Sequence, residues 1–179
     1  MIPLPGQDRS DQARSLLCAR VAAPFGPVHF FVTHLNWPLN EGSIRLEQVG
    51  ALVEAIDRRA PNEKGHFPPI LVGDLNAEPE SDEIRFLNGL ATVDGRSTYF
   101  ADAWRYAGEG PGFTFDPRND YAATCNEPPR RIDYIFVGSP GLVGLGKPIS
   151  ARLAFDQPVE GVFPSDHFGI VADLRTGEP

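Results

Sequence analysis

Four short polar segments carry carboxylates, imidazoles and amides at spacings that could support chemistry on a phosphate group. Such groups can together hold a divalent metal, orient a phosphate and move a proton. Three of the segments stand at the edge of an apolar run, where a strand would deliver their side chains to a rim. The four segments are residues 33–36 (THLN), 73–76 (GDLN), 131–134 (RIDY) and 165–167 (SDH).

Asp74 and Asn76 directly follow a short apolar run that ends in Gly73. Because they are two residues apart, their side chains point the same way on an extended backbone. A carboxylate beside an amide can position a water and hold a phosphoryl oxygen. The structural alternative is an Asx turn at the end of a strand, which is a common motif.

Asp133 lies within an otherwise apolar run, where a carboxylate is costly unless it is paired or lies at the end of the sheet. We expect His167 to be its partner, because a carboxylate fixes the tautomer of an imidazole and raises its basicity. Arg130 or Arg131 is the alternative partner.

The segment around His167 offers two more candidate groups. Asp166 suits a hard cation such as Mg2+, and His167 suits proton transfer or charge stabilisation. The alternative is that Ser165 caps a turn beside a surface histidine. His34 and Asn36, at the end of another apolar run, gain weight only in the company of the other segments.

Alternating and near-continuous apolar runs predict several strands, and a stripe of period 3.6 predicts a helix over 43–59 with Arg45 facing water. A second helix is expected over 82–90, after Ser81. Residues 105–131 form a long loop rich in Gly, Pro and Asp. This pattern predicts one α+β domain over 1–179, with sheets packed together and helices outside. The predicted strands are 15–22, 28–32, 70–72, 132–137, 149–155 and 168–174.

Composition limits the partners. The formal net charge of −8 argues against a nonspecific binder of duplex DNA and favours a small phosphoester substrate. No apolar stretch is long enough to span a bilayer, and no leader is visible, so a cytoplasmic protein is expected. Cys18 and Cys125 are expected to be free thiols. Nothing in the sequence indicates an oligomeric state.

In this order, the segments THLN, GDLNAEP, RRIDYIFV and PSDHFG resemble the endonuclease/exonuclease/phosphatase superfamily over roughly residues 14–175. The resemblance implies two packed, mostly antiparallel sheets flanked by helices, a four-layer α/β/β/α sandwich. It also implies hydrolysis of phosphoester bonds, of the phosphodiesterase, phosphatase or nuclease type, with Mg2+ or Mn2+ as cofactor.

The resemblance also implies roles for individual residues. Asp74 resembles the aspartate that orients or deprotonates the attacking water, and His167 the histidine that contacts the scissile phosphate. Asp133 resembles the aspartate that orients this histidine, and His34 a histidine that contacts the phosphate or assists the leaving group. Asp166, with Asp74, would hold the metal. Asn76, and more weakly Asn36, would contact the phosphate together with His167.

The sequence departs from the family pattern at its start. Family members open with a strand carrying an Asn and a strand ending in Gln-Glu, whose Glu is a principal metal ligand. Glu41, Glu47, Glu54 and Glu78 do not match that context. We therefore expect an N-terminally truncated domain with weak or no turnover.

Two alternatives follow. The first is a catalytically silent remnant that serves as a binding module. The second is a nuclease on single-stranded nucleic acid, which would need a basic groove from Arg105, Arg118, Arg130 and Arg131.

Overall fold

A six-stranded sheet forms the centre of the computed structural model, which describes residues 1–9, 12–60, 65–140 and 144–177. Its strand order is β1-β2-β3-β4-β6-β5, and all neighbouring pairs are antiparallel except β3 and β4. These strands are β1 (Ile2–Pro3), β2 (Ser15–Ala23), β3 (Gly26–His34), β4 (Ile70–Asp74), β5 (Phe100–Asp102) and β6 (Asp133–Gly138).

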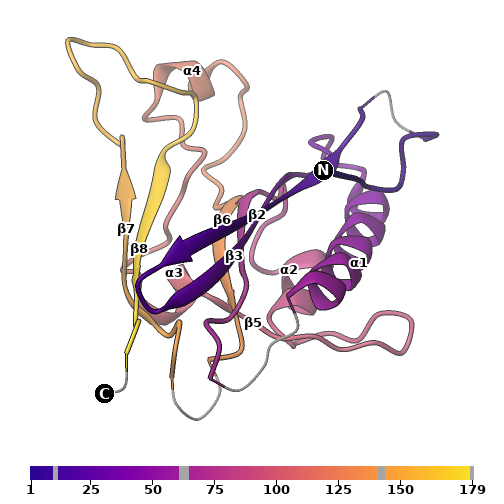
Figure 1. The fold of residues 1–179 in the computed structure, drawn as a ribbon. Helices are drawn as coiled ribbons and strands as arrows, with labels where there is room; N and C mark the ends of the chain where they lie inside the picture. The colour runs from indigo at the N-terminus through magenta and orange to yellow at the C-terminus, as the bar shows by residue number, and fades with distance from the viewer. Residues whose placement is uncertain (10–11, 61–64, 141–143, 178–179) are drawn as a thin grey trace.

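A second sheet pairs β7 (Pro148–Ala154) with β8 (Gly169–Leu174) in antiparallel fashion. Leu174 of β8 packs against the buried cluster of Val28, Phe67 and Ile70, so the small sheet covers part of one face of the large one (Figure 1). The expected α+β class with two mostly antiparallel sheets is confirmed.

The opposite face of the large sheet is covered by α1 (Gly42–Arg59) and α2 (Asp82–Leu87) (Figure 1). Alternate strand residues such as Leu16, Phe31 and Leu71 point to this side and are fully or almost fully buried against Leu52 and Ile56 of α1. This period-two alternation on the strands and the apolar stripe of α1 build the main core.

The face toward the small sheet is covered less completely. Leu17 and Val21 of β2 and Val32 of β3 are 48%, 46% and 39% exposed, respectively. Each lies next in sequence to a residue of the opposite, helix-covered face. The exposure of these apolar side chains therefore reflects which face of the sheet they occupy and not a break in the strand pattern.

Two short helices were not expected: α3 (Ala103–Ala107) packs against β6 and β7, and α4 (Asp120–Ala123) lies within the long loop. The helix predicted over 82–90 ends three residues early, at Leu87. The expectation that Arg45 faces water is wrong. Its guanidinium is buried because it pairs with Glu83 at 2.9 Å and donates to the carbonyl of Pro38. Among the residues placed in the structure, no helix has the length and apolarity needed to cross a bilayer.

Candidate metal and phosphoester site

Three neighbouring strands, β3, β4 and β6, have a terminus at the same end of the large sheet. Each places a polar side chain there. His34 ends β3, Asp74 ends the parallel strand β4, and Asp133 begins the antiparallel strand β6. In the strand register His34 lies opposite Asp74, and Asp74 lies opposite Asp133. His167 comes from the segment that leads into β8. The topology therefore places four titratable side chains in a row across this end of the sheet.

Gly73 makes the close approach of β3 and β4 sterically feasible. Its φ is +140°, and a Cβ at this position would lie 1.9 Å from the carbonyl oxygen of Thr33. Any side chain here would push β4 away from β3 and would carry Asp74 with it.

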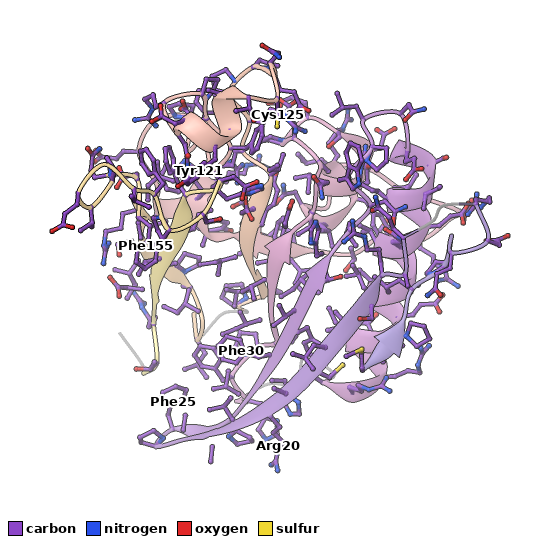
Figure 2. The ribbon with its side chains drawn as sticks, turned by 90° about the horizontal axis from the view of Figure 1, so that it is seen from above. Arg20, Phe25, Phe30, Tyr121, Cys125 and Phe155 are labelled. Atoms are coloured by element: carbon purple, nitrogen blue, oxygen red, sulfur yellow. The ribbon has the colours of Figure 1, made fainter. Side chains whose placement is uncertain are left out.

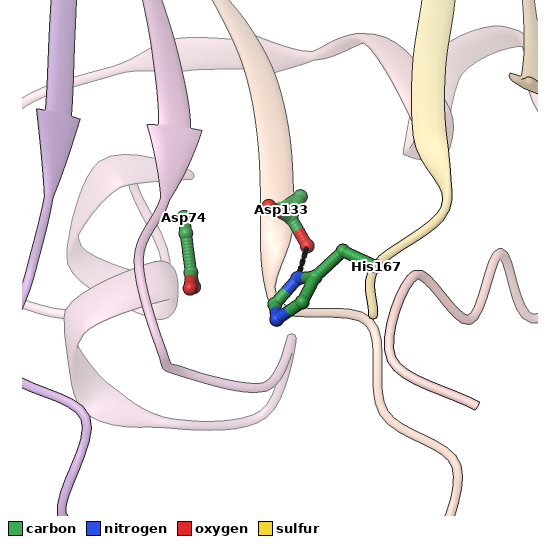
Figure 3. Close-up of side chains that lie close together, drawn as sticks. All are labelled: Asp74, Asp133 and His167. Atoms are coloured by element: carbon green, nitrogen blue, oxygen red, sulfur yellow. Dashed lines mark hydrogen bonds and ion pairs between the residues drawn. The ribbon is translucent and has the colours of Figure 1, made fainter. Parts of the chain in front are cut away.

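Asp74, Asp133 and His167 form the compact part of the row (Figure 3). One ligand atom from each lies within 4.8 Å of the others. His167 Nδ1 and Asp133 Oδ2 are 2.8 Å apart, which confirms the expected pairing. The alternative partners of Asp133 are engaged elsewhere, since Arg130 pairs with Glu127 and Arg131 with Asp102.

Burial raises the pKa of Asp74 to about 6, and the neighbouring Asp133 carboxylate contributes to this shift. The backbone N–H of Asn76 donates to Asp74 Oδ1 at 2.8 Å and opposes the shift. The Asx turn considered as an alternative is therefore present, but the second carboxylate oxygen of Asp74 still faces His34 Nε2 at 3.4 Å. Asp74 therefore uses one carboxylate oxygen for the turn and directs the other toward the candidate site.

The two imidazoles shift in opposite directions. Burial lowers the pKa of His34, and the positive charges of Arg14 and His167 lower it further. Burial alone would also lower the pKa of His167, but its hydrogen bond to Asp133 and the charges of Asp133 and Asp74 raise it above the ordinary value. His167 is therefore the more readily protonated of the two imidazoles.

The remaining candidate residues lie around this cluster. Asp166 is exposed and accepts a hydrogen bond from Ser165 Oγ at 3.2 Å. Asn76 is buried beside Asp74, with φ of +50°, and its amide donates to the carbonyl of Leu35 at 3.1 Å.

Asn36 is placed differently. Its side chain is fully buried, donates to Glu41 at 2.7 Å and accepts from Gln48 at 2.8 Å. These bonds fix the loop after β3 on α1, so contact with a phosphate would require Asn36 to exchange them. The family's principal metal ligand is a glutamate, and among the described residues the cluster of Asp74, Asp133 and His167 contains none.

Sequence reasoning missed residues that hold the site together from the long loop. The buried hydroxyl of Thr114 accepts from the backbone N–H groups of Ile132 and Asp133, both at 3.2 Å, and its carbonyl accepts from Phe168 N at 2.7 Å. Thr114 thus ties the segment of Asp133 to that of His167. Buried Asn119 donates to the carbonyl of Ser165 at 2.7 Å. The expectation that a long loop is functional was the only sequence signal for either residue.

Two further residues next to the site were missed. Arg14 precedes β2 closely enough to interact electrostatically with Asp74, and burial lowers its pKa. Phe155 follows β7, is 67% exposed and has φ of +58°. Its side chain lines a hollow of about 310 Å³ together with Asp133 and His167.

The sequence pattern of the Endonuclease/Exonuclease/phosphatase family matches residues 16–167, which covers all four polar segments. The chain belongs to the endonuclease/exonuclease/phosphatase family. This family is a superfamily of metal-dependent phosphoesterases and nucleases, so its members are hydrolytic enzymes. No curated protein matches the chain.

Solved structures share the family fold. D. rerio TDP2 complexed with single strand DNA product has a TM-score of 0.69 at 23% identity and covers 92% of this chain. Truncated C. elegans TDP2 has a TM-score of 0.65 at 25% identity and covers 94%. The Bacteroides vulgatus endonuclease/exonuclease/phosphatase has a TM-score of 0.65 at 22% identity and covers 91%. This chain in turn spans 63%, 62% and 56% of those three chains.

Proposed function

We propose that this chain hydrolyses phosphoester bonds with the help of a divalent metal ion. The observation that carries the proposal is the convergence of Asp74, Asp133 and His167, which are far apart in the sequence, within 4.8 Å of one another. Convergence also favours phosphoester chemistry over the alternative of a catalytically silent remnant, for which these side chains need not share a site.

The residues present fit a hard cation. Asp74 and Asp133 bring two carboxylates together, and their mutual repulsion contributes to the raised pKa of Asp74. A cation would relieve this repulsion. Because Asp133 Oδ2 is engaged by His167, Asp74 is the carboxylate of the cluster that we assign as a metal ligand. Asp166 lies outside the three-residue cluster, and we assign it as the second ligand from the family resemblance. Mg2+ binds in many proteins through one or two carboxylates with water and substrate phosphate as the other ligands. Mg2+ or Mn2+ supplies Lewis-acid polarisation of a phosphoryl oxygen when bound.

In this proposal the side chains divide the remaining work. Asp74 orients the attacking water and accepts its proton. The bond from His167 Nδ1 to Asp133 leaves Nε2 to stabilise the charge that develops on the phosphate. His34 contacts the phosphate or the leaving group, and Asn76, with Asn36 if it leaves its present partners, holds phosphate oxygens.

We favour a small phosphoester as substrate over duplex DNA because the net charge is −8. A nuclease on single strands is a weaker candidate, since three of the four arginines that could form a basic groove are already in ion pairs: Arg118 with Asp116, Arg130 with Glu127 and Arg131 with Asp102. Gel-shift binding with a steep salt dependence would favour the nuclease instead.

The proposal is tested by hydrolysis of bis(p-nitrophenyl) phosphate with Mg2+ or Mn2+. We expect slow turnover that EDTA abolishes, and a loss of about 10²-fold or more in Asp74→Asn and His167→Ala. Asp57→Asn, a substitution of an exposed carboxylate on α1, should keep the wild-type rate. Hydrolysis that survives EDTA, or that Asp74→Asn and Asp57→Asn leave equally active, would refute the proposal.

A further inference from the structure

A second polar hollow, which we call the basic hollow, lies at the other end of the large sheet. Four nitrogen-bearing side chains line it: Arg20, His29, Arg59 and His66. Its volume is about 250 Å³. His29 and His34 are five residues apart on β3, which places the two sites roughly 17 Å apart along the strand. Figure 2 shows Arg20 on the hairpin of β2 and β3, far from Phe155 beside the candidate active site.

The fold brings these four side chains together from four segments. Arg20 and His29 are cross-strand partners of β2 and β3, so their side chains share one face of the sheet. Arg59 is the last residue of α1, which packs on that same face. His66 precedes β4. The convergence is therefore a property of the tertiary fold and not of a run of charges in the sequence.

The walls of the basic hollow are apolar and well packed. Phe67 is 8% exposed, and its ring lies 5.2 Å from that of Phe25 in a tilted pair. Pro27, Ala60 and Pro69 complete the lining.

Two side chains of the basic hollow, Arg20 and Arg59, carry charges that no described carboxylate compensates. No carboxylate belongs to its lining as far as the structure describes it, and the guanidinium groups of Arg20 and Arg59 make no hydrogen bond or ion pair there. Of the twelve other arginines, seven find acidic partners in the described part of this acidic chain. The pairs are Arg9–Glu47, Arg45–Glu83, Arg58–Glu54, Arg96–Glu54, Arg118–Asp116, Arg130–Glu127 and Arg131–Asp102.

We infer that the basic hollow binds a phosphate group, at a site separate from the candidate active site. Two unpaired guanidinium groups around one hollow repel each other, and a bound anion removes that repulsion. Guanidinium forms bidentate hydrogen bonds with phosphate oxygens, and the imidazoles add donors. The volume accommodates one small phosphorylated molecule, or one phosphate of a strand entering from solvent.

Calorimetric titration of the whole chain with inorganic pyrophosphate tests this inference. EDTA is present, so that a metal-assisted site does not contribute. We expect one pyrophosphate per chain. Arg20→Gln and Arg59→Gln should each weaken binding by about tenfold, the loss typical of a hydrogen bond between charged groups. Arg58→Gln makes the same change of charge on the preceding residue of α1, outside the lining, and should change affinity little.

A second arm maps the site and separates it from the candidate active site. Pyrophosphate should shift the amide resonances of His29 and Phe67 in NMR spectra, and should do so equally in His167→Ala. An oligothymidylate that displaces pyrophosphate would identify a nucleic-acid strand as the source of the phosphate, and failure to displace it would identify a free small phosphate. Absence of binding to the wild type, equal losses in Arg58→Gln and Arg59→Gln, or loss of binding in His167→Ala would each overturn the inference.

Discussion

At the scale of single residues, the candidate site depends on one carboxylate in a costly position. Asp74 is only 15% exposed in its side chain and lies beside Asp133, and both features disfavour its charged form. The same features make it a proton acceptor near neutral pH and a ligand that gains from a cation. The burial and the neighbouring charge that suit Asp74 for catalysis therefore also lower the stability of the folded protein.

The first prediction concerns Asp74→Asn in the metal-free protein. The folded pKa of about 6 lies above the ordinary value of 3.8 for an aspartate, so ionised Asp74 destabilises the fold above pH 6. The penalty shrinks as pH falls from 6 and is absent below 3.8, where both states are protonated. Asp74→Asn should raise the free energy of unfolding at pH 8 by on the order of 1–3 kcal/mol and should change it little near pH 4. Urea unfolding with EDTA at both pH values measures this, and a loss of stability at pH 8 would contradict it.

At the scale of elements, the positions of Asp133 and His167 depend on the long loop between α3 and β6. Thr114 receives two backbone N–H groups at the start of β6 and one from Phe168. Such a contact fixes the distance between two segments without touching a substrate. It is a positioning role, which spacing in the sequence cannot reveal.

The second prediction compares Thr114→Val with Thr114→Ser. Valine keeps the volume but leaves two buried N–H groups without an acceptor, which should lower the free energy of unfolding by about 1–3 kcal/mol. Serine keeps the hydroxyl and should lose less. Urea unfolding of both variants decides the matter, and equal losses would show that the methyl group, not the hydroxyl, matters at this position.

The third prediction uses neighbouring residues of β2 that point to opposite faces of the sheet. Leu16 is fully buried under α1, whereas Leu17 is 48% exposed on the other face. Leu16→Ala should destabilise the protein by about 2–5 kcal/mol. Leu17→Ala should cost less than about 1 kcal/mol. Thermal and urea unfolding would contradict the assigned faces if the two losses were similar.

Elements with a clear period were predictable from the sequence, and those made by pairing were not. The alternation in β2 and β6 and the stripe of α1 placed these elements within one or two residues of their observed bounds. β1 and β5 have two and three residues and exist only through their partners β2 and β6, so no local pattern marks them.

The candidate site was partly predictable for a similar reason. An isolated carboxylate in an apolar strand is costly unless it is paired, and this cost predicted the pair of Asp133 and His167. The burial of Arg45 depends on Glu83, 38 positions away in the chain, and the role of Thr114 depends on backbone groups of other segments. Neither leaves a signal in residue types alone.

At the scale of the whole molecule, the fold carries two candidate sites for anionic ligands at opposite ends of one sheet. The candidate active site is acidic and would need a cation before it could accept a phosphoester. The basic hollow needs none. The two sites should therefore respond differently to EDTA, and metal binding is the property that separates them.

The central claim is that a divalent metal binds at the end of the large sheet where Asp74, Asp133 and His167 converge. NMR titration with Mn2+ tests this claim most directly. Paramagnetic broadening should appear first at the amides of Asp74, Asp133 and His167. It should disappear in Asp74→Asn and persist in Asp57→Asn. Broadening centred elsewhere on the chain, or unchanged in Asp74→Asn, would contradict the claim.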